Sequence, residues 1–161
     1  MAKVELEVIE NEAKKTLEKY ENIELKPKDR LLIPIQDMPN QDPAERITNM
    51  NEVALGYTES QVKVESLRCL QCKNAPCIQG CPVGINIPLF IEKAAQGDFA
   101  GSVAVIRESS MLPAICGRVC PQESQCQLTC TVGKSLKSVE KAVNIGRIER
   151  YVADWESENN V

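Results

Sequence analysis

Apolar residues recur at helical spacing in several segments of the chain, which predicts amphipathic helices. The first is predicted over residues 4–21, with charged residues on its other face. Thr58 and Gln61 form a capping-box pattern, which predicts a helix over about 59–70 that brings Cys69 into its last turn. The apolar positions of the first helix are Leu6, Ile9, Ala13, Leu17 and Tyr20.

The same spacing predicts further helices in the second half of the chain. One covers about 86–96, and another, capped by Asp98 and ended by Pro113, covers about 99–110. The last is predicted over about 139–156. Its apolar stripe consists of Ile145, Ile148, Val152 and Trp155.

The segment between the first two helices has a different character. Residues 26–50 contain four prolines, a density that argues against a regular element. Residues 31–35 are mostly apolar, so this part of the segment should pack against something. We interpret the segment as an extended strap; a short strand could form in it, but no second strand is evident.

Composition excludes several classes of protein. The 161 residues suit one domain with appended segments, and 43% of them are hydrophobic although only 4% are aromatic. No apolar run approaches the roughly 20 residues that a membrane span requires. The net charge of −4 comes from interspersed acids and bases, without the basic block that would indicate nucleic-acid binding.

All eight cysteines fall in two short runs, enough for two four-iron clusters. The first run reads C-x2-C-x4-C-x3-C-P and ends at Pro82. In two-cluster ferredoxins the Cys before the Pro ligates the other cluster, so Cys69, Cys72 and Cys77 are predicted to share one cluster and Cys81 to reach the second. The second run consists of Cys116, Cys120, Cys126 and Cys130.

Three other uses of the cysteines fit the sequence less well. A disulfide scaffold suits small secreted domains, but this chain is long for that class and opens without the apolar core of a signal peptide. All-Cys zinc sites usually show paired C-x2-C knuckles, and only Cys69 and Cys72 have that spacing. A thioredoxin-type pair would need a βαβ pattern, which the chain lacks.

One acidic residue of the last predicted helix is oddly placed. Glu149 falls beside the apolar stripe, and no basic residue at i±3 or i±4 can pair with it. A carboxylate that faces a core needs a partner or a route to water. Glu149 is therefore either a side chain that reaches solvent or a cluster ligand.

Several motifs together resemble a known family, the N-terminal iron–sulfur domain of the glutamate synthase small subunit. Relatives in that family are dihydropyrimidine dehydrogenase and the large subunit of NADH-dependent ferredoxin:NADP oxidoreductase. The similarity runs from about residue 36 to 156. The motifs are Asp42-Pro43 with Arg46, Glu52-Val53-Ala54-Leu55-Gly56-Tyr57, Arg68-Cys69-Leu70-Gln71-Cys72-Lys73, Gly80-Cys81-Pro82-Val83, Cys116-Gly117-Arg118-Val119-Cys120-Pro121 and Asn144-Ile145-Gly146-Arg147-Ile148-Glu149.

The resemblance implies an all-α, α-helical-ferredoxin-like domain around two [4Fe-4S] clusters. It divides the chain into residues 1–35, an N-terminal helix and strap for packing or partner contact, and residues 36–161, the two-cluster domain. The implied ligands of the first cluster are Cys69, Cys72, Cys77 and Cys130. Those of the second are Cys81, Cys120, Cys126 and Glu149, which leaves Cys116 as a buried neighbour. Spacing alone makes Cys116 the alternative fourth ligand.

The chain also departs from the family. Its relatives continue into a flavin- and nicotinamide-binding module, whereas no G-x-G-x-x-G turn occurs here. We therefore expect no FAD or NAD(P) site in this chain, and we expect a separate flavoprotein subunit that binds FAD and NAD(P)H.

The resulting hypothesis is a cytoplasmic, non-catalytic electron-transfer subunit. It would relay single electrons between a partner flavoprotein and other iron–sulfur subunits or redox centres. The complex could be a glutamate synthase, a ferredoxin:NADP transhydrogenase or an electron-bifurcating hydrogenase. The alternatives are a zinc-bound structural module and an enzyme with an open cluster site; acid–base catalysis is not expected, since the chain has no His and no catalytic dyad.

Overall fold

The computed structural model describes residues 2–20 and 23–160, and in these ranges the regular elements are helices. The predicted all-α class is therefore confirmed. The α-helices are α1 (Ala2–Tyr20), α2 (Pro27–Arg30), α3 (Pro43–Arg46), α4 (Glu59–Leu67), α5 (Pro76–Gly80), α6 (Ile87–Ala95), α7 (Phe99–Arg107), α8 (Pro113–Val119), α9 (Cys126–Thr129), α10 (Thr131–Ser135) and α11 (Ile145–Asn159). Two 3₁₀ turns, Gln122–Ser124 and Val139–Lys141, complete the set.

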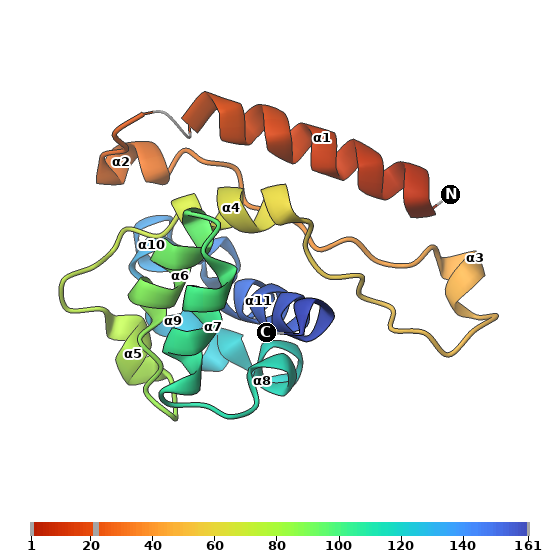
Figure 1. The fold of residues 1–161 in the computed structure, drawn as a ribbon. Helices are drawn as coiled ribbons and strands as arrows, with labels where there is room; N and C mark the ends of the chain where they lie inside the picture. The colour runs from red at the N-terminus through yellow and green to blue at the C-terminus, as the bar shows by residue number, and fades with distance from the viewer. Residues whose placement is uncertain (1, 21–22, 161) are drawn as a thin grey trace.

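The N-terminal helix α1 lies across one side of the molecule, directly over α4, and helices α5 to α11 gather beneath α4 (Figure 1). Its predicted apolar stripe is the side that is covered: Ala13 is buried, and Leu6, Ile9, Leu17 and Tyr20 are partly buried. The predicted polar face is exposed. The helix was predicted over 4–21, and residue 21 lies outside the described residues. These contacts favour packing on the chain as the role of α1.

Helix α4 begins with the predicted capping box. The backbone N–H of Gln61 donates to Thr58 Oγ1 at 3.3 Å, and that of Thr58 donates to Gln61 Oε1 at 3.0 Å. The helix ends at Leu67, with Arg68 as its C-cap, so the prediction that Cys69 lies in its last turn is wrong. Cys69 instead opens the loop that follows, where it can turn away from the helix axis.

The prediction that prolines keep residues 26–50 irregular is wrong at two places. Proline is tolerated in the first turn of a helix, and the one-turn helices α2 and α3 both begin at one, Pro27 and Pro43. The pairing partner that was not evident from sequence is residues 53–55, because Asn40 and Ala54 form an antiparallel bridge. These segments form an arm that extends away from the body and carries α3 (Figure 1).

Pro113 has a different role from the predicted one. Helix α7 already ends at Arg107, and Pro113 occupies the first turn of α8, which carries Cys116. The second cysteine run then continues over short helical turns. A further short helix, α5, forms within the first cysteine run, and Pro76 again starts it.

The last helix is shorter at its start than predicted. Residues 139–141 form a separate 3₁₀ turn, and α11 begins at Ile145. Its stripe packs against α7 and α8, with Ile145, Ile148 and Val152 buried. Figure 1 shows α11 within the helical body, where it contacts α4, α6, α7 and α8.

Candidate metal centre

Four cysteines from distant parts of the chain line one small cavity. Cys69, Cys72 and Cys77 come from the loop after α4 and from α5, and Cys130 comes from the turn between α9 and α10. Cys69 and Cys130 are each 8% exposed. The rest of the lining is mostly apolar and includes Ile91, Val132 and Val143. The structure thus brings together the four residues that sequence resemblance assigned to the first cluster.

A second cavity collects the remaining candidates. Its donors are Cys81, Cys116, Cys120, Cys126 and Glu149. They lie on the segments around α8, on α9 and on α11, and the first run contributes only Cys81. The cysteine before Pro82 therefore leaves its own run to join the second one, as the Cys-Pro pattern predicted.

Two buried isoleucines lie between these cavities. Ile87, at the start of α6, and Ile145, at the start of α11, line both of them. Each is at most 3% exposed. Their side chains keep water away from both sets of donors and set how closely the two sites approach.

The two cysteine runs meet where α5 crosses α9, and a glycine permits the crossing. A Cβ added to Gly80 would lie 2.6 Å from Thr129 Oγ1 and 2.8 Å from the carbonyl oxygen of Gln125. No side chain fits there without movement of the backbone. Gly80 therefore allows Cys77 and Cys81 to lie beside Cys126 and Cys130.

All eight cysteines are free thiols, which removes the disulfide scaffold as an interpretation. Burial raises the pKa of Cys69 to about 11 and the pKa of Cys77 to about 12. Burial likewise raises the pKa of Cys126 to about 12. Such thiols give up their protons at neutral pH only to a bound metal, because a coordinating cation stabilises the thiolate.

Glu149 has the environment of a metal ligand and not that of a surface carboxyl. Its side chain is 6% exposed, and its Oε1 has no hydrogen-bond partner. Burial raises the pKa of the carboxyl to about 7. The interpretation that Glu149 reaches solvent is therefore wrong, and the orphaned oxygen fits a role in holding a cation.

The donors surround cavities and do not converge on one point. In the described part of the chain, no three Cys, Asp or Glu side chains are close enough to bind a single metal ion. Thiolates in runs of this spacing are the ligands that iron–sulfur clusters use. The donor sets of both cavities therefore fit [4Fe-4S] clusters.

Two features of the surroundings were not predicted from sequence. The guanidinium of Arg30, on α2, donates to the carbonyl oxygens of Leu67 and Cys69. The buried carboxylate of Glu65 accepts hydrogen bonds from the backbone of Gln36 and Asn144. The only available sequence signals were an Arg in the strap and a Glu at a buried helical position. Neither signal indicates which distant residue the side chain contacts.

Comparison with known families decides the assignment. The family described as dihydropyrimidine dehydrogenase domain II, 4Fe-4S cluster, matches residues 46–161. The chain belongs to this family. As a member of the dihydropyrimidine dehydrogenase domain II family, it is a helical 4Fe-4S domain, which confirms the predicted resemblance and fold.

Individual members of related enzymes are similar over most of this chain. The NAD-dependent dihydropyrimidine dehydrogenase subunit PreT of Escherichia coli K12 is 36% identical over 112 residues, 70% of this chain and 26% of the relative. The glutamate synthase [NADPH] small chain of the same organism is 37% identical over 103 residues, 64% of this chain and 21% of the relative. The corresponding small chain of Azospirillum brasilense is 32% identical over 120 residues, 74% of this chain and 24% of the relative.

The chain therefore spans about a quarter of the length of the relatives that it matches. None of the relatives named here is an electron-bifurcating hydrogenase, so the comparisons give that possibility no support. Over residues 2–20 and 23–160, no helix combines the length and the hydropathy needed to cross a bilayer.

Proposed function

We propose that the chain binds two [4Fe-4S] clusters and relays single electrons between a partner flavoprotein and a second redox centre of an oxidoreductase complex. The observation that carries the proposal is the division of the donors into two cavities. One holds four thiols, and the other holds four thiols and a buried carboxyl. When bound, such clusters supply one-electron chemistry.

In this proposal Cys69, Cys72, Cys77 and Cys130 hold the first cluster. Cys81, Cys120, Cys126 and Glu149 hold the second. The second cavity offers five donors for four positions, so one donor must stay free. Glu149 is the better ligand because its Oε1 has no other partner, whereas Cys116 Sγ lies 3.8 Å from Ser110 Oγ, with which it can share a hydrogen bond.

The chain's own residues would set the electron affinity of each site. Apolar lining residues such as Ile87 and Ile145 exclude water from both cavities. Burial and hydrogen bonds to ligand sulfurs change the reduction potential. The Cys72 thiol donates to Thr131 Oγ1 at 3.3 Å, and the same hydroxyl would be placed to donate to a Cys72 thiolate. A carboxylate in place of one thiolate should also give the second site a different potential from the first.

The names of the relatives support the proposed flavoprotein partner. PreT is named as a subunit of an NAD-dependent dehydrogenase, and the glutamate synthase relative is named as a small chain. A domain of this family would therefore work beside a flavin- and nicotinamide-binding protein. The cytoplasmic location stays a prediction.

The test is to purify the protein without oxygen and to measure iron, acid-labile sulfide and the EPR spectrum after reduction. We expect about eight iron and eight sulfide per chain and two reducible signals. Zinc without sulfide would contradict the proposal and favour a structural module.

The fourth ligand of the second cluster can be found with a matched pair of variants. Glu149→Ala should lose about half of the iron and one EPR signal, whereas Cys116→Ala should keep both. The opposite result would assign Cys116 as the ligand. Glu149→Cys, which supplies a thiolate at the same position, should restore the iron content and change the potential of one cluster only.

A further inference from the structure

Arg30 connects the N-terminal segment to the first cysteine of the chain. It lies on α2, partly buried, and it is outside the region that matches the family, residues 46–161. One of its guanidinium nitrogens donates to the carbonyl oxygen of Leu67 at 2.8 Å and to that of Cys69 at 3.1 Å. These two carbonyls flank the C-cap of α4, where the chain turns into the loop that carries Cys69 and Cys72.

The contact satisfies backbone groups that the helix cannot satisfy itself. The last carbonyls of a helix have no partner within it, and a cation at that end is favoured by the helix dipole. The N–H of Cys69 still donates to the carbonyl oxygen of Ser66 at 3.1 Å, but α4 stops at Leu67 and the carbonyls of Leu67 and Cys69 face Arg30. Arg30 therefore fixes the direction in which the chain leaves α4.

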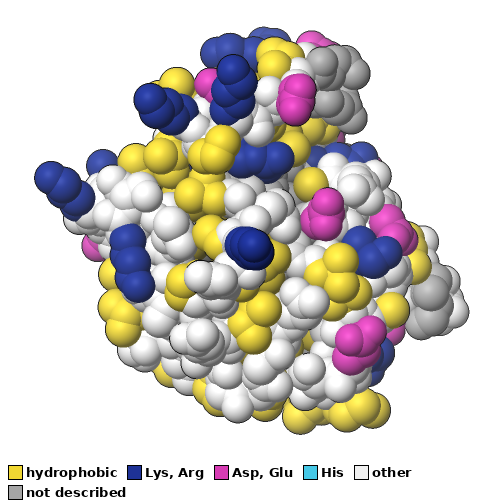
Figure 2. All heavy atoms as spheres, turned by 90° about the vertical axis from the view of Figure 1, so that its left-hand side faces the viewer, with side chains coloured by type: hydrophobic (Ala, Val, Ile, Leu, Met, Phe, Trp, Pro, Cys, Tyr) yellow, Lys and Arg dark blue, Asp and Glu magenta, His cyan; other side chains and the backbone are white. Residues whose placement is uncertain are grey.

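The positive charge of Arg30 has no acidic partner in the described part of the chain. Within residues 2–20 and 23–160 no acidic group lies within ion-pairing distance of it. The other guanidinium beside this loop, that of Arg68, is paired with the buried carboxylate of Glu65. Figure 2 views the molecule from the side of α2 and the loop after α4. Lys and Arg side chains spread over the left and centre of this face, and acidic side chains lie mainly toward its right.

We propose that Arg30 is a positioning residue for the first cluster, which holds the Cys69 loop and raises the cluster's reduction potential. The inference rests on the proposed function, because it requires a reducible cluster on Cys69, Cys72, Cys77 and Cys130. Reduction adds a negative charge to the cluster, and a cation fixed beside a ligand stabilises that charge. The N-terminal segment thereby acts on the electron-transfer site, although it lies outside the matched family region.

The test is an EPR-monitored redox titration of four anaerobically purified proteins: wild type, Arg30→Gln, Arg30→Lys and Lys28→Gln. Arg30→Gln keeps a hydrogen-bond donor and removes the charge, and Arg30→Lys keeps the charge. Lys28, an exposed residue of the same short helix, is the matched control for a general loss of surface charge. In Arg30→Gln the equilibrium constant for reduction of one cluster should fall about tenfold, a shift of about 59 mV.

Arg30→Lys should stay close to wild type, and Lys28→Gln should shift both clusters by less. The shifted signal should be the one that Cys130→Ala abolishes, which assigns it to the first cluster. Unchanged potentials in Arg30→Gln, or an equal shift in Lys28→Gln, would overturn the proposal. Loss of iron from Arg30→Gln, with iron retained in Arg30→Lys, would support the proposal. Loss of iron from both variants would contradict a role for the positive charge.

These results are distinguishable from failure of the proposed function. A wild-type protein without iron, sulfide and reducible signals would contradict the function itself. Two reducible clusters in the wild-type protein, with the same potentials in the Arg30 variants, would contradict only the role of Arg30.

Discussion

The carboxylate of Glu65 accepts a hydrogen bond from the backbone N–H of Asn144 at 2.9 Å, across 79 positions of the chain. Its other oxygen accepts from the backbone N–H of Gln36 at 2.9 Å. Arg68 pairs with Glu65 and donates to the carbonyl oxygens of Ala142 and Lys141 at 3.0 and 2.7 Å. This buried network joins the strap, the end of α4 and the start of α11, which are the segments that lead to Cys69 and Glu149.

The first prediction concerns this network. Glu65→Gln or Arg68→Met leaves the other charge buried without its ionic partner, which should lower the free energy of unfolding by about 3–5 kcal/mol. Urea unfolding of the metal-free protein measures it. The matched control is Glu59→Gln, which breaks the exposed Glu59–Lys63 pair of the same helix and should cost about 0.3–0.5 kcal/mol. An equal decrease in the free energy of unfolding in Glu59→Gln would show that the buried network stabilises the fold no more than an exposed ion pair does.

The second prediction concerns the crossing of α8 and α11. A Cβ on Gly117 would lie 2.6 Å from the backbone nitrogen of Arg150 and 2.8 Å from the carbonyl oxygen of Gly146. Helix propensity alone would favour Gly117→Ala by about 1 kcal/mol, but we expect a net loss of about 1–3 kcal/mol because the helices must separate.

The separation should also affect the second cavity, because α8 carries Cys116 and leads to Cys120, while α11 carries Glu149. Iron analysis of Gly117→Ala should therefore show loss from the second cluster. Ile115→Ala on the same helix is the control, because the Ile115 side chain is 53% exposed. Full retention of iron in Gly117→Ala would show that the crossing does not determine ligand positions.

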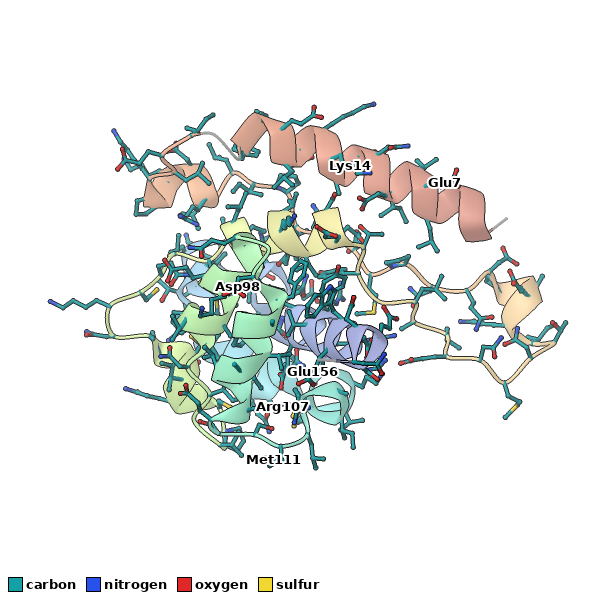
Figure 3. All side chains as sticks on the ribbon, viewed as in Figure 1. Glu7, Lys14, Asp98, Arg107, Met111 and Glu156 are labelled. Atoms are coloured by element: carbon teal, nitrogen blue, oxygen red, sulfur yellow. The ribbon has the colours of Figure 1, made fainter. Side chains whose placement is uncertain are left out.

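The third prediction concerns pH. Arg107 on α7 and Glu156 on α11 form a two-pronged ion pair, with Nε to Oε1 at 2.7 Å, and Figure 3 labels both residues where these helices meet. Hydrogen bonding to Arg107 lowers the pKa of Glu156. A carboxyl with a lowered pKa stabilises the fold above its unfolded pKa, about 4.3, and this contribution is lost as pH falls through the folded value.

Thermal unfolding of wild type and Glu156→Gln should therefore differ most near neutral pH and converge in acid. The difference near pH 7 should be about 1 kcal/mol or less, as for other partly exposed pairs. Arg107→Met should abolish the difference, because the carboxyl then has no partner. A stability difference between wild type and Glu156→Gln that increases as pH falls would contradict the predicted direction.

The fourth prediction concerns the two isoleucines between the cavities. Ile87→Ala should cost about 2–5 kcal/mol, because the side chain is buried and the space cannot fully close. Both clusters should then lose iron faster to a chelator, since water reaches both donor sets. Ile115→Ala on α8, where the side chain is 53% exposed, is the control and should have little effect. Loss from only one cluster would show that Ile87 protects one site alone.

Local patterns were sufficient to predict the longer helices and most of the donors. The capping box at Thr58, the apolar stripe of α11 and the cysteine spacings involve residues within a few positions of each other. The errors also have local causes. Prolines that begin short helices were interpreted as breaks, and the end of α4 was placed too late because no glycine marks it.

The sequence by itself determined the kind of site, because ligand type and spacing are properties of short segments. It also placed Glu149 at a position where a carboxyl has no local partner. The Cys-Pro pattern predicted that Cys81 joins the second group, and the family resemblance implied that Cys130 joins Cys69. Only the tertiary structure decided that Ile87 and Ile145 lie between the two groups. Only it showed that Arg30 and Glu65 support the loops that carry the ligands. These contacts connect residues tens of positions apart, and they depend on how the helices pack, which no local pattern encodes.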